Sequence, residues 1–135
     1  MSAVRIDHMG VIVADLDASV AKFKKLLGEG PASTKKMPDV GLRVAVFEAA
    51  NIAIELLEYT GENSEFAKRV MSERRGINHF SAEVADIDAA ISELTEAGFI
   101  LQDGFPRDGV HGQVAFFEPD ETTGLLFEIC QFDRT

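Results

Sequence analysis

The sequence predicts an α+β fold in which two tandem β-α-β-β-β modules form one curved mixed sheet. Three observations lead to this prediction: an internal repeat, the same order of strand and helix patterns in both halves, and polar residues at equivalent places in otherwise apolar strands. The chain has 135 residues, of which 46% are hydrophobic, and this is enough for one domain to bury a core without disulfides.

The internal repeat relates the two halves in three blocks that keep their order. Residues 6–18 match 77–89 at an offset of 71, residues 44–48 match 114–118 at an offset of 70, and residues 52–57 match 125–130 at an offset of 73. Single apolar matches arise easily by chance, but three blocks in register do not. We infer an ancestral duplication, which predicts that both halves fold in the same way.

Each half opens with a strand that is followed by a helix. Residues 4–13 and 77–84 are apolar, β-branched runs of the kind found in buried strands. An aspartate then provides an N-cap in each half, and apolar residues three and four positions apart form one helical face. The glycines at the ends of these helices fit the C′ position. The two caps are Asp15 and Asp86, and the two glycines are Gly28 and Gly98.

Three shorter strands are expected to complete each half. They are predicted near residues 32–37, 42–48 and 52–59, and again near residues 99–102, 113–118 and 125–132. A segment without a repeat copy joins the halves and carries a helical pattern over 64–74. The predicted organisation is a single domain over residues 1–135, with module one at 4–60, a linker helix at 61–76 and module two at 77–132.

Charge and composition exclude several classes of function. The chain has 13 Lys and Arg against 23 Asp and Glu, which gives a net charge of −10. Such a chain lacks the basic surface that nucleic-acid phosphates and anionic membranes require. No apolar run approaches the roughly 18 residues of a membrane span. Cys130 is the only cysteine, so neither an intrachain disulfide nor a cysteine-based zinc site is expected. We expect a cytoplasmic protein.

Four polar residues inside apolar strands point to a common site. His8 and Glu55 lie in strands of the first half, and His79 and Glu128 occupy the equivalent positions of the second. Buried carboxylates are costly unless they are paired. A pseudo-twofold axis between the halves would bring all four side chains together. Two imidazoles and two carboxylates then form a nitrogen and oxygen site for one divalent metal ion, and the predicted sheet would surround it.

Each of these residues has an ordinary structural interpretation when it is taken alone. A single histidine on an apolar strand is usually a satisfied core residue, and a single glutamate near a strand end is usually solvated, as we expect for Glu48 and Glu58. Cys130 is expected to be a small buried hydrophobe. His111 lies in a glycine-rich loop and has no repeat partner. It is the joint occurrence at repeat positions that favours a metal site.

These motifs resemble the vicinal oxygen chelate superfamily, which includes glyoxalase I. The resemblance covers essentially the whole chain, and within the superfamily it is greatest to methylmalonyl-CoA epimerases. The family's typical segments are matched by residues 6–11, 51–58, 64–68, 76–79, 111–112 and 124–128. By this resemblance the metal ligands are His8, Glu55, His79 and Glu128.

The resemblance also implies a reaction and its participants. The metal ion (Co, Ni, Zn or Mn) would polarise the oxygens of a small acyl-thioester substrate, and a base would remove the proton beside the thioester carbonyl. Glu128 would be one acid–base residue, and His111 with Gly112 would contact the substrate. A homodimer is expected, with no nucleic acid and no membrane as partner.

The second acid–base residue is less directly indicated. Some family members carry a glutamate in the strand before the one that holds Glu55, and Val44 stands at that place here. Glu48, Asp39 or the ligand Glu55 could take the role instead. Glu55 is favoured because a ligand carboxylate also serves as the base in the glyoxalase reaction.

Three other functions remain open from the sequence. A lactoylglutathione lyase of the glyoxalase I type would use the same metal and base with a different pocket rim. A non-catalytic small-molecule binding protein of the superfamily would normally lack the full ligand set. An iron-dependent dioxygenase usually keeps two histidines and one carboxylate, so a fourth ligand disfavours it.

Overall fold

The computed structural model describes residues 3–133, which divide into two compact units. The first unit comprises residues 8–78, and the second comprises residues 3–7 together with 79–133. Residues 1–2 and 134–135, the outermost positions of the single domain predicted over 1–135, lie outside the described residues. The described residues form eight strands and three helices, and none of these helices is long and apolar enough to cross a membrane.

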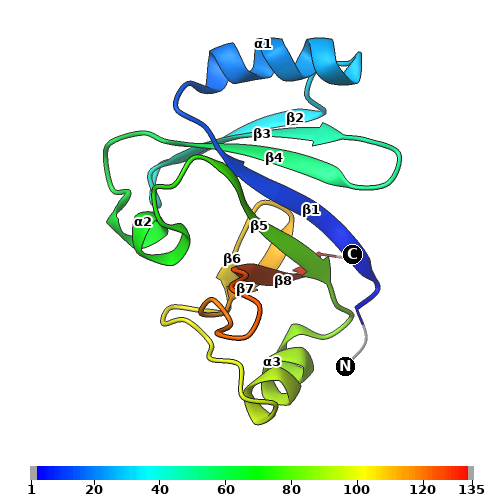
Figure 1. The fold of residues 1–135 in the computed structure, drawn as a ribbon, viewed down its shortest axis with the longest axis vertical. Coiled ribbons are helices and arrows are strands. Elements are labelled where there is room, and N and C mark those ends of the chain that lie inside the picture. The colour runs from blue at the N-terminus through cyan, green and yellow to red at the C-terminus, as the bar shows by residue number, and fades with distance from the viewer. Residues whose placement is uncertain (1–2, 134–135) are drawn as a thin grey trace. The chain divides into compact units, whose positions relative to one another are not determined.

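The first unit contains one helix and four strands, followed by a short second helix (Figure 1). The strands lie in the order β2-β3-β4-β1, in which β1 and β4 are parallel and the other pairs antiparallel. Its elements are β1 (Arg5–Ile12), α1 (Leu16–Leu27), β2 (Ser33–Met37), β3 (Leu42–Glu48), β4 (Ala53–Tyr59) and α2 (Glu65–Met71).

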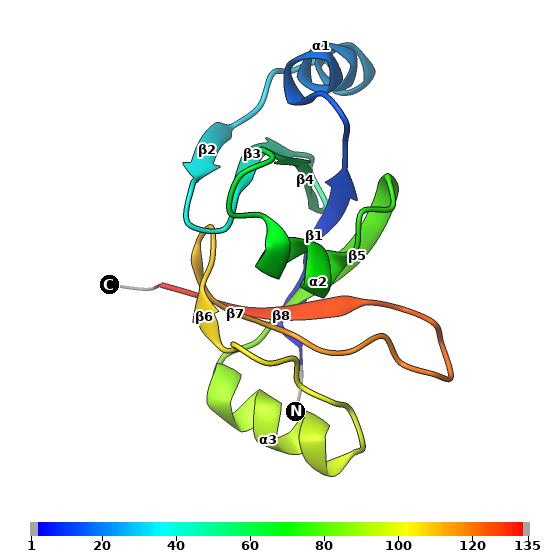
Figure 2. The same ribbon diagram turned by 90° about the vertical axis from the view of Figure 1, so that its left-hand side faces the viewer.

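The second unit repeats this plan, with α3 beside β7 and β8 (Figure 2). Its strands lie in the order β5-β8-β7-β6, again with a parallel first pair and antiparallel neighbours. The amino-terminal end of β1 also belongs here, because the Val4 N–H donates to the Glu83 carbonyl at 2.7 Å. Its elements are β5 (Gly76–Glu83), α3 (Ile87–Glu96), β6 (Arg107–Asp108), β7 (Gly112–Phe116) and β8 (Phe127–Phe132). The predicted α+β class with a mixed sheet is confirmed.

The two long helices begin in the same way. Asp15 has φ −139° and ψ 107° and accepts from the Ala18 N–H at 3.0 Å. Asp86 has φ −139° and ψ 105° and accepts from the Ala89 N–H at 3.1 Å. Each aspartate satisfies an N–H that the first helical turn would otherwise leave without an acceptor. Gly28 ends α1 with φ 84°, as predicted for a C-terminal glycine.

The two long helices, α1 and α3, each pack on one face of the strands of their own half. In the first unit Leu16, Ala45, Phe47 and Leu56 form the buried core under α1. The equivalent residues in the second unit belong to the core under α3, and they are Ile87, Ala115, Phe117 and Ile129. Because side chains alternate along a strand, the residues between these core positions point to the opposite face.

Three local predictions are wrong, each for a physical reason. Residues 99–102 form no strand. Leu101 makes one isolated bridge to Phe117, and the strand that pairs with the outer edge of β7 is β6. The segment packs on the core instead, through Phe99, Leu101 and Phe105. Apolar contacts therefore hold it in place more than strand-to-strand hydrogen bonds do. The linker helix stops at Met71, because Ser72 has φ 63° and the Asn78 amide donates to the Met71 carbonyl.

The third wrong prediction concerns Glu58, which is half-buried and not simply solvated. Its carboxylate accepts from the Leu16 N–H at 2.8 Å and from the Arg43 guanidinium at 3.0 Å. This glutamate therefore satisfies the start of α1 from a neighbouring strand. Glu48, by contrast, is exposed as expected.

Candidate metal centre

The two glutamates selected by the repeat lie on the faces opposite the long helices α1 and α3. Glu55 alternates with Ile54 and Leu56, which pack under α1, and Glu128 precedes the core residue Ile129. Both carboxylates are buried, with 5% and 6% of their surface exposed. Strand alternation thus places a carboxylate on the face opposite the long helix in each unit.

The two histidines follow the same register. His8 lies two residues before Gly10, the register partner of Glu55, and His79 lies two residues before Ser81, the register partner of Glu128. Both imidazoles are 5% exposed. Each therefore projects from the same face as the carboxylate of its neighbouring strand.

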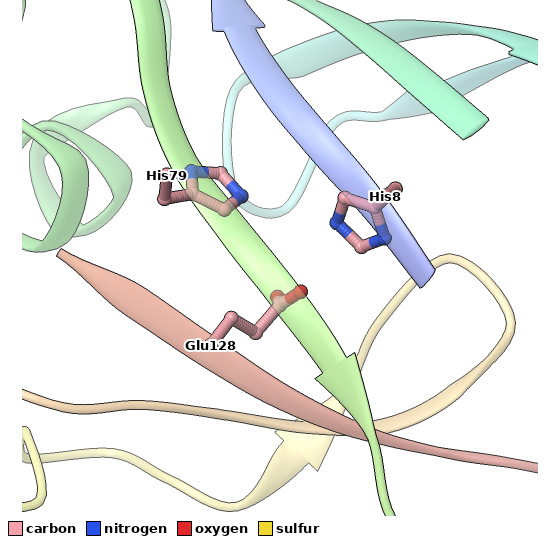
Figure 3. A group of neighbouring side chains, drawn as sticks. All are labelled: His8, His79 and Glu128. Carbon is pink, nitrogen blue, oxygen red and sulfur yellow. The ribbon is translucent and has the colours of Figure 1, made fainter. Parts of the chain in front are cut away.

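Three of the four predicted ligands form a compact group. One ligand atom from each of His8, His79 and Glu128 lies within 4.8 Å of the others. Figure 3 shows the three side chains, which are carried by β1, β5 and β8. Imidazole nitrogen and carboxylate oxygen are ligands suited to Zn²⁺, Co²⁺, Ni²⁺ and Mn²⁺.

The fourth predicted ligand, Glu55, belongs to a second group that shares His8. Ligand atoms of Asp7, His8 and Glu55 also lie within 4.8 Å of one another, and His8 Nδ1 is 3.4 Å from Glu55 Oε2. Asp7 was not selected from the sequence. Its only signal is a carboxylate within an apolar strand, and its repeat mate is Asn78, which carries no charge.

Asp7 has an ion-pair partner in Arg5. The Arg5 guanidinium donates to Asp7 at 2.9 Å and to Glu83 at 2.8 Å. The hydrogen bond to Glu83 is the main cause that raises the pKa of Arg5 above its usual value. Two buried carboxylates are thus partly compensated by one cation that is itself half exposed.

Aromatic rings pack beside His79 and Glu128. The Phe116 ring meets the His79 imidazole edge to face, with 4.8 Å between ring centres. Phe116 is also the register partner of Glu128 on β7. In the first unit the residue opposite Glu55 is Val46, which is smaller. The Glu128 carboxylate therefore has a bulkier apolar neighbour than the Glu55 carboxylate has, and this lowers the dielectric constant around Glu128.

The Cys130 thiol lies on the same face as Glu128, two residues along β8. Burial raises its pKa to about 12, so the thiol is protonated at neutral pH. Its Sγ donates weakly to the Ala82 carbonyl at 3.7 Å. The predicted role of a small buried residue is confirmed.

The predicted substrate residues His111 and Gly112 lie at the start of β7. The His111 side chain is exposed, and its ring stacks on Phe132 with 5.5 Å between centres. A Cβ on Gly112 would lie 2.2 Å from the Gln131 carbonyl oxygen, so no larger residue fits there. This glycine is required by the close approach of the backbone.

Glu55 is the most enclosed of the residues considered for the second acid–base role. Glu48 lies at the end of β3 and Asp39 in the turn before it, and both are exposed. Val44 is buried and paired with Leu57, so it contributes only apolar surface.

Known proteins share this sequence pattern and this fold. The sequence profile of the Glyoxalase/Bleomycin resistance protein/Dioxygenase superfamily matches residues 7–117. The chain belongs to this superfamily. An ethylmalonyl-CoA/methylmalonyl-CoA epimerase from Cereibacter sphaeroides is 37% identical over 130 residues, which cover 94% of this chain and 97% of that protein.

Two further proteins that are similar to this chain are named methylmalonyl-CoA epimerases. The mitochondrial methylmalonyl-CoA epimerase of Homo sapiens is 29% identical over 94% of this chain and 73% of its own length. A variant of the Streptomyces coelicolor methylmalonyl-CoA epimerase was solved in complex with 2-nitronate-propionyl-CoA. It superposes with a TM-score of 0.84 at 28% identity, over 99% of this chain and 98% of that one.

Proposed function

We propose that the protein is a metal-dependent epimerase that inverts the carbon beside the thioester carbonyl of methylmalonyl-CoA or a close acyl thioester. The observation that carries this proposal is the buried group of His8, His79 and Glu128, whose ligand atoms lie within 4.8 Å of one another. It occurs in a chain that is 37% identical to an ethylmalonyl-CoA/methylmalonyl-CoA epimerase over nearly its whole length. The superfamily resemblance supplies the reaction type.

The donor set fits a divalent metal ion. Ligand atoms at about 2.1 Å from an ion lie at most about 4.2 Å from one another, and the observed limit of 4.8 Å is close to this separation. His8, His79 and Glu128 would hold the ion, and Glu55 would be the fourth ligand. When bound, the ion would polarise the thioester oxygen and stabilise the negative charge that develops there.

Epimerisation requires two proton carriers on opposite faces of the reacting carbon. Glu128 accepts the proton from one face as a carboxylate. Glu55, protonated at that moment, returns a proton to the other face, and the configuration is inverted. Both side chains are buried, which excludes the water that would otherwise solvate the two carboxyl groups. The reverse reaction exchanges the two roles.

His111 and Gly112 would contact the rest of the substrate. The His111 ring is exposed and held against Phe132, so it can present a nitrogen to a polar group without leaving its place. Gly112 keeps the backbone close to β8. The homodimer and the cytoplasmic location implied by the resemblance stay predictions.

Proton exchange at the substrate tests the reaction directly. The protein is incubated with methylmalonyl-CoA in deuterated water, and the label at the α-carbon is followed by mass spectrometry. With the epimer whose proton Glu128 accepts, we expect rapid incorporation that falls by about 100- to 10,000-fold in Glu128→Gln, because a carboxamide cannot accept the proton. Glu96→Gln, an exposed change at the end of α3, serves as the matched control and should exchange normally.

The alternative isomerase is tested in the same preparation. Absence of exchange with methylmalonyl-CoA, together with turnover of a glutathione hemithioacetal, would assign the site to a lactoylglutathione lyase. Absence of turnover with either substrate, in a protein that binds small thioesters, would favour a binding protein.

Metal content is measured separately from activity. Protein purified without chelators should contain about one divalent ion per chain. Elemental analysis also identifies the native ion among Co, Ni, Zn and Mn. Finding no bound metal, and no thermal stabilisation by any of these four ions, would contradict the proposed metal site.

A further inference from the structure

We propose that Ser81 is a positioning residue for Glu128: its buried hydroxyl donates a hydrogen bond to the Glu128 carboxylate when the site holds its metal ion. This inference rests on the proposed function. Nothing in the sequence comparison between the halves selects Ser81 as a ligand or an acid–base residue, because a serine is neither at neutral pH. Its position and its surroundings carry the inference.

Ser81 lies directly beside Glu128 in the second unit. The two residues are register partners in the parallel pair of β5 and β8. The next residue pair, Ala82 and Ile129, belongs to the core under α3. Alternation therefore directs Ser81 and Glu128 to the same face, the one that also carries His79.

The Ser81 side chain is fully buried, and among the described residues its hydroxyl has no hydrogen-bond partner of good geometry. Its exposed fraction is 0%, and its Oγ has no partner of acceptable geometry. An unsatisfied buried hydroxyl costs about 1–3 kcal/mol, and native proteins rarely keep one without a reason. The Ser81 hydroxyl does interact with the Cys130 thiol, and this contact works against the rise in the pKa of that thiol. Sulfur is a weak acceptor, however, and the thiol donates to the Ala82 carbonyl, so this contact does not replace a full hydrogen bond for Ser81.

The first unit shows that the fold does not require a hydroxyl at this place. Gly10 is the repeat equivalent of Ser81, and it is the register partner of Glu55 just as Ser81 is of Glu128. The parallel strand pair therefore forms with no side chain at all at this position. Of the two glutamates in the proposed site, only Glu128 has a serine as its register partner, whereas Glu55 has a glycine.

A hydroxyl beside a carboxylate ligand holds it in one orientation. A hydrogen bond from a neutral donor to a carboxylate is short and about twice as strong as one between neutral groups. It fixes one oxygen and leaves the other directed at the ion or at the proton that it accepts. Losing such a supporting group typically costs about 10- to 100-fold in metal affinity or activity.

The test titrates the metal-free full-length protein with Co²⁺ and follows the visible absorption of the bound ion. We expect Ser81→Ala and Ser81→Cys to weaken Co²⁺ binding by about 10- to 100-fold and to lower kcat for α-proton exchange with little change in KM. The cysteine variant is close in size to serine but is a weak donor. Ser81→Thr keeps the hydroxyl and should retain most of the affinity.

Two controls separate this role from a structural one. Cys130→Ala removes the other polar neighbour of Ser81 and should leave Co²⁺ affinity unchanged. In the metal-free protein Ser81→Ala should be at least as stable to heat as the parent, because it removes an unsatisfied buried group. A purely structural serine would instead make the metal-free variant less stable than its parent.

The outcomes distinguish this inference from the proposed function. If Ser81→Ala binds Co²⁺ and exchanges the α-proton as the parent does, or if Cys130→Ala reproduces its defect, the role of Ser81 is overturned while the epimerase stands. If the parent binds Co²⁺ but exchanges no proton, the proposed reaction is overturned. If Ser81→Ala then still binds the ion more weakly than the parent, the positioning role of Ser81 is supported on its own. A parent that binds no Co²⁺ overturns both.

Discussion

The two halves of the molecule share their framework and differ in the polar groups attached to it. Their helix caps have nearly identical angles, and the backbone bond that follows the first strand recurs as Val13 to Leu57 at 2.9 Å and Val84 to Cys130 at 2.8 Å. The first backbone N–H of each long helix also donates to a side chain of the half's last strand at 2.8 Å.

The side chains that accept these two bonds are different. In the first half the acceptor is Glu58, which also binds Arg43, and Arg43 reaches Asp17 at 3.1 Å. In the second half the acceptor is Gln131, a neutral amide. The geometry of the contact was kept while its charge changed. The comparison teaches that a duplicated fold preserves its backbone hydrogen bonds first and allows its polar side chains to diverge.

The largest expected difference concerns the two glutamates of the candidate centre. With each epimer of methylmalonyl-CoA supplied separately in deuterated water, Glu128→Gln and Glu55→Gln should each lose exchange for the epimer whose proton that residue accepts, by about 100- to 10,000-fold. Each variant should retain exchange without inversion for the opposite epimer. Equal loss for both epimers in one variant would mean that this residue acts mainly as a metal ligand.

The next effect tests whether the two cores contribute equally to stability. Phe47 and Phe117 occupy equivalent positions and are 1% and 0% exposed. Changing either to alanine should lower the free energy of unfolding by about 3–5 kcal/mol through lost burial and a residual cavity. Chemical denaturation followed by circular dichroism measures this. A value near zero for one variant would show that its half contributes little to the measured unfolding transition.

A smaller effect separates the charged contact of the first half from the neutral one of the second. Glu58→Ala and Gln131→Ala each remove the acceptor of a helix N–H, so each should cost about 1–3 kcal/mol. Glu58→Gln imitates the second half and should cost less than Glu58→Ala. Added salt should narrow the difference between the parent and Glu58→Gln, because the Arg43 pair is partly exposed.

The smallest effect concerns Tyr59, whose repeat equivalent is Phe132. The Tyr59 hydroxyl donates to the Ser72 carbonyl at 2.6 Å, and burial with the Glu73 charge raises its pKa to about 12. Tyr59→Phe should cost about 1 kcal/mol near neutral pH. Denaturation midpoints of the parent and the variant compare their stabilities at each pH.

The pH dependence of this difference has a definite sign. The pKa of Tyr59 is raised from 10.0 to about 12 in the folded protein, so the unfolded chain loses the proton first. The stabilising contribution is complete below pH 10 and declines as the pH rises toward 12. The stability advantage of the parent over Tyr59→Phe should therefore shrink and then reverse over this interval, whereas a constant difference would show that the hydroxyl does not titrate as described.

Most of the helices and strands could be predicted from the sequence, because the signals that start and end them lie within a few residues of each element. Aspartate caps, the Gly28 terminus and the apolar runs of the strands act within a few residues, so β3, β4, α1 and α3 lie where they were expected. The repeat supplied what no single residue could, namely that His8, Glu55, His79 and Glu128 are two equivalent pairs.

The tertiary structure decided the contacts that join distant residues. Glu58 lies 42 positions from the helix N–H that it accepts, and no local pattern marks it as a capping residue. Residues 99–102 begin with an apolar run that suggests a strand, but they pack through Phe99 and Leu101, since core burial there outweighs ladder hydrogen bonds.

The same division applies to the candidate centre. The sequence by itself determined which donor atoms are available and that they occur as repeated pairs. Only the folded chain shows that Asp7 joins the group of His8 and Glu55, and that Ser81 lies fully buried beside Glu128. The physical reason is that residue type fixes the chemistry of a side chain, whereas strand register and packing fix its neighbours.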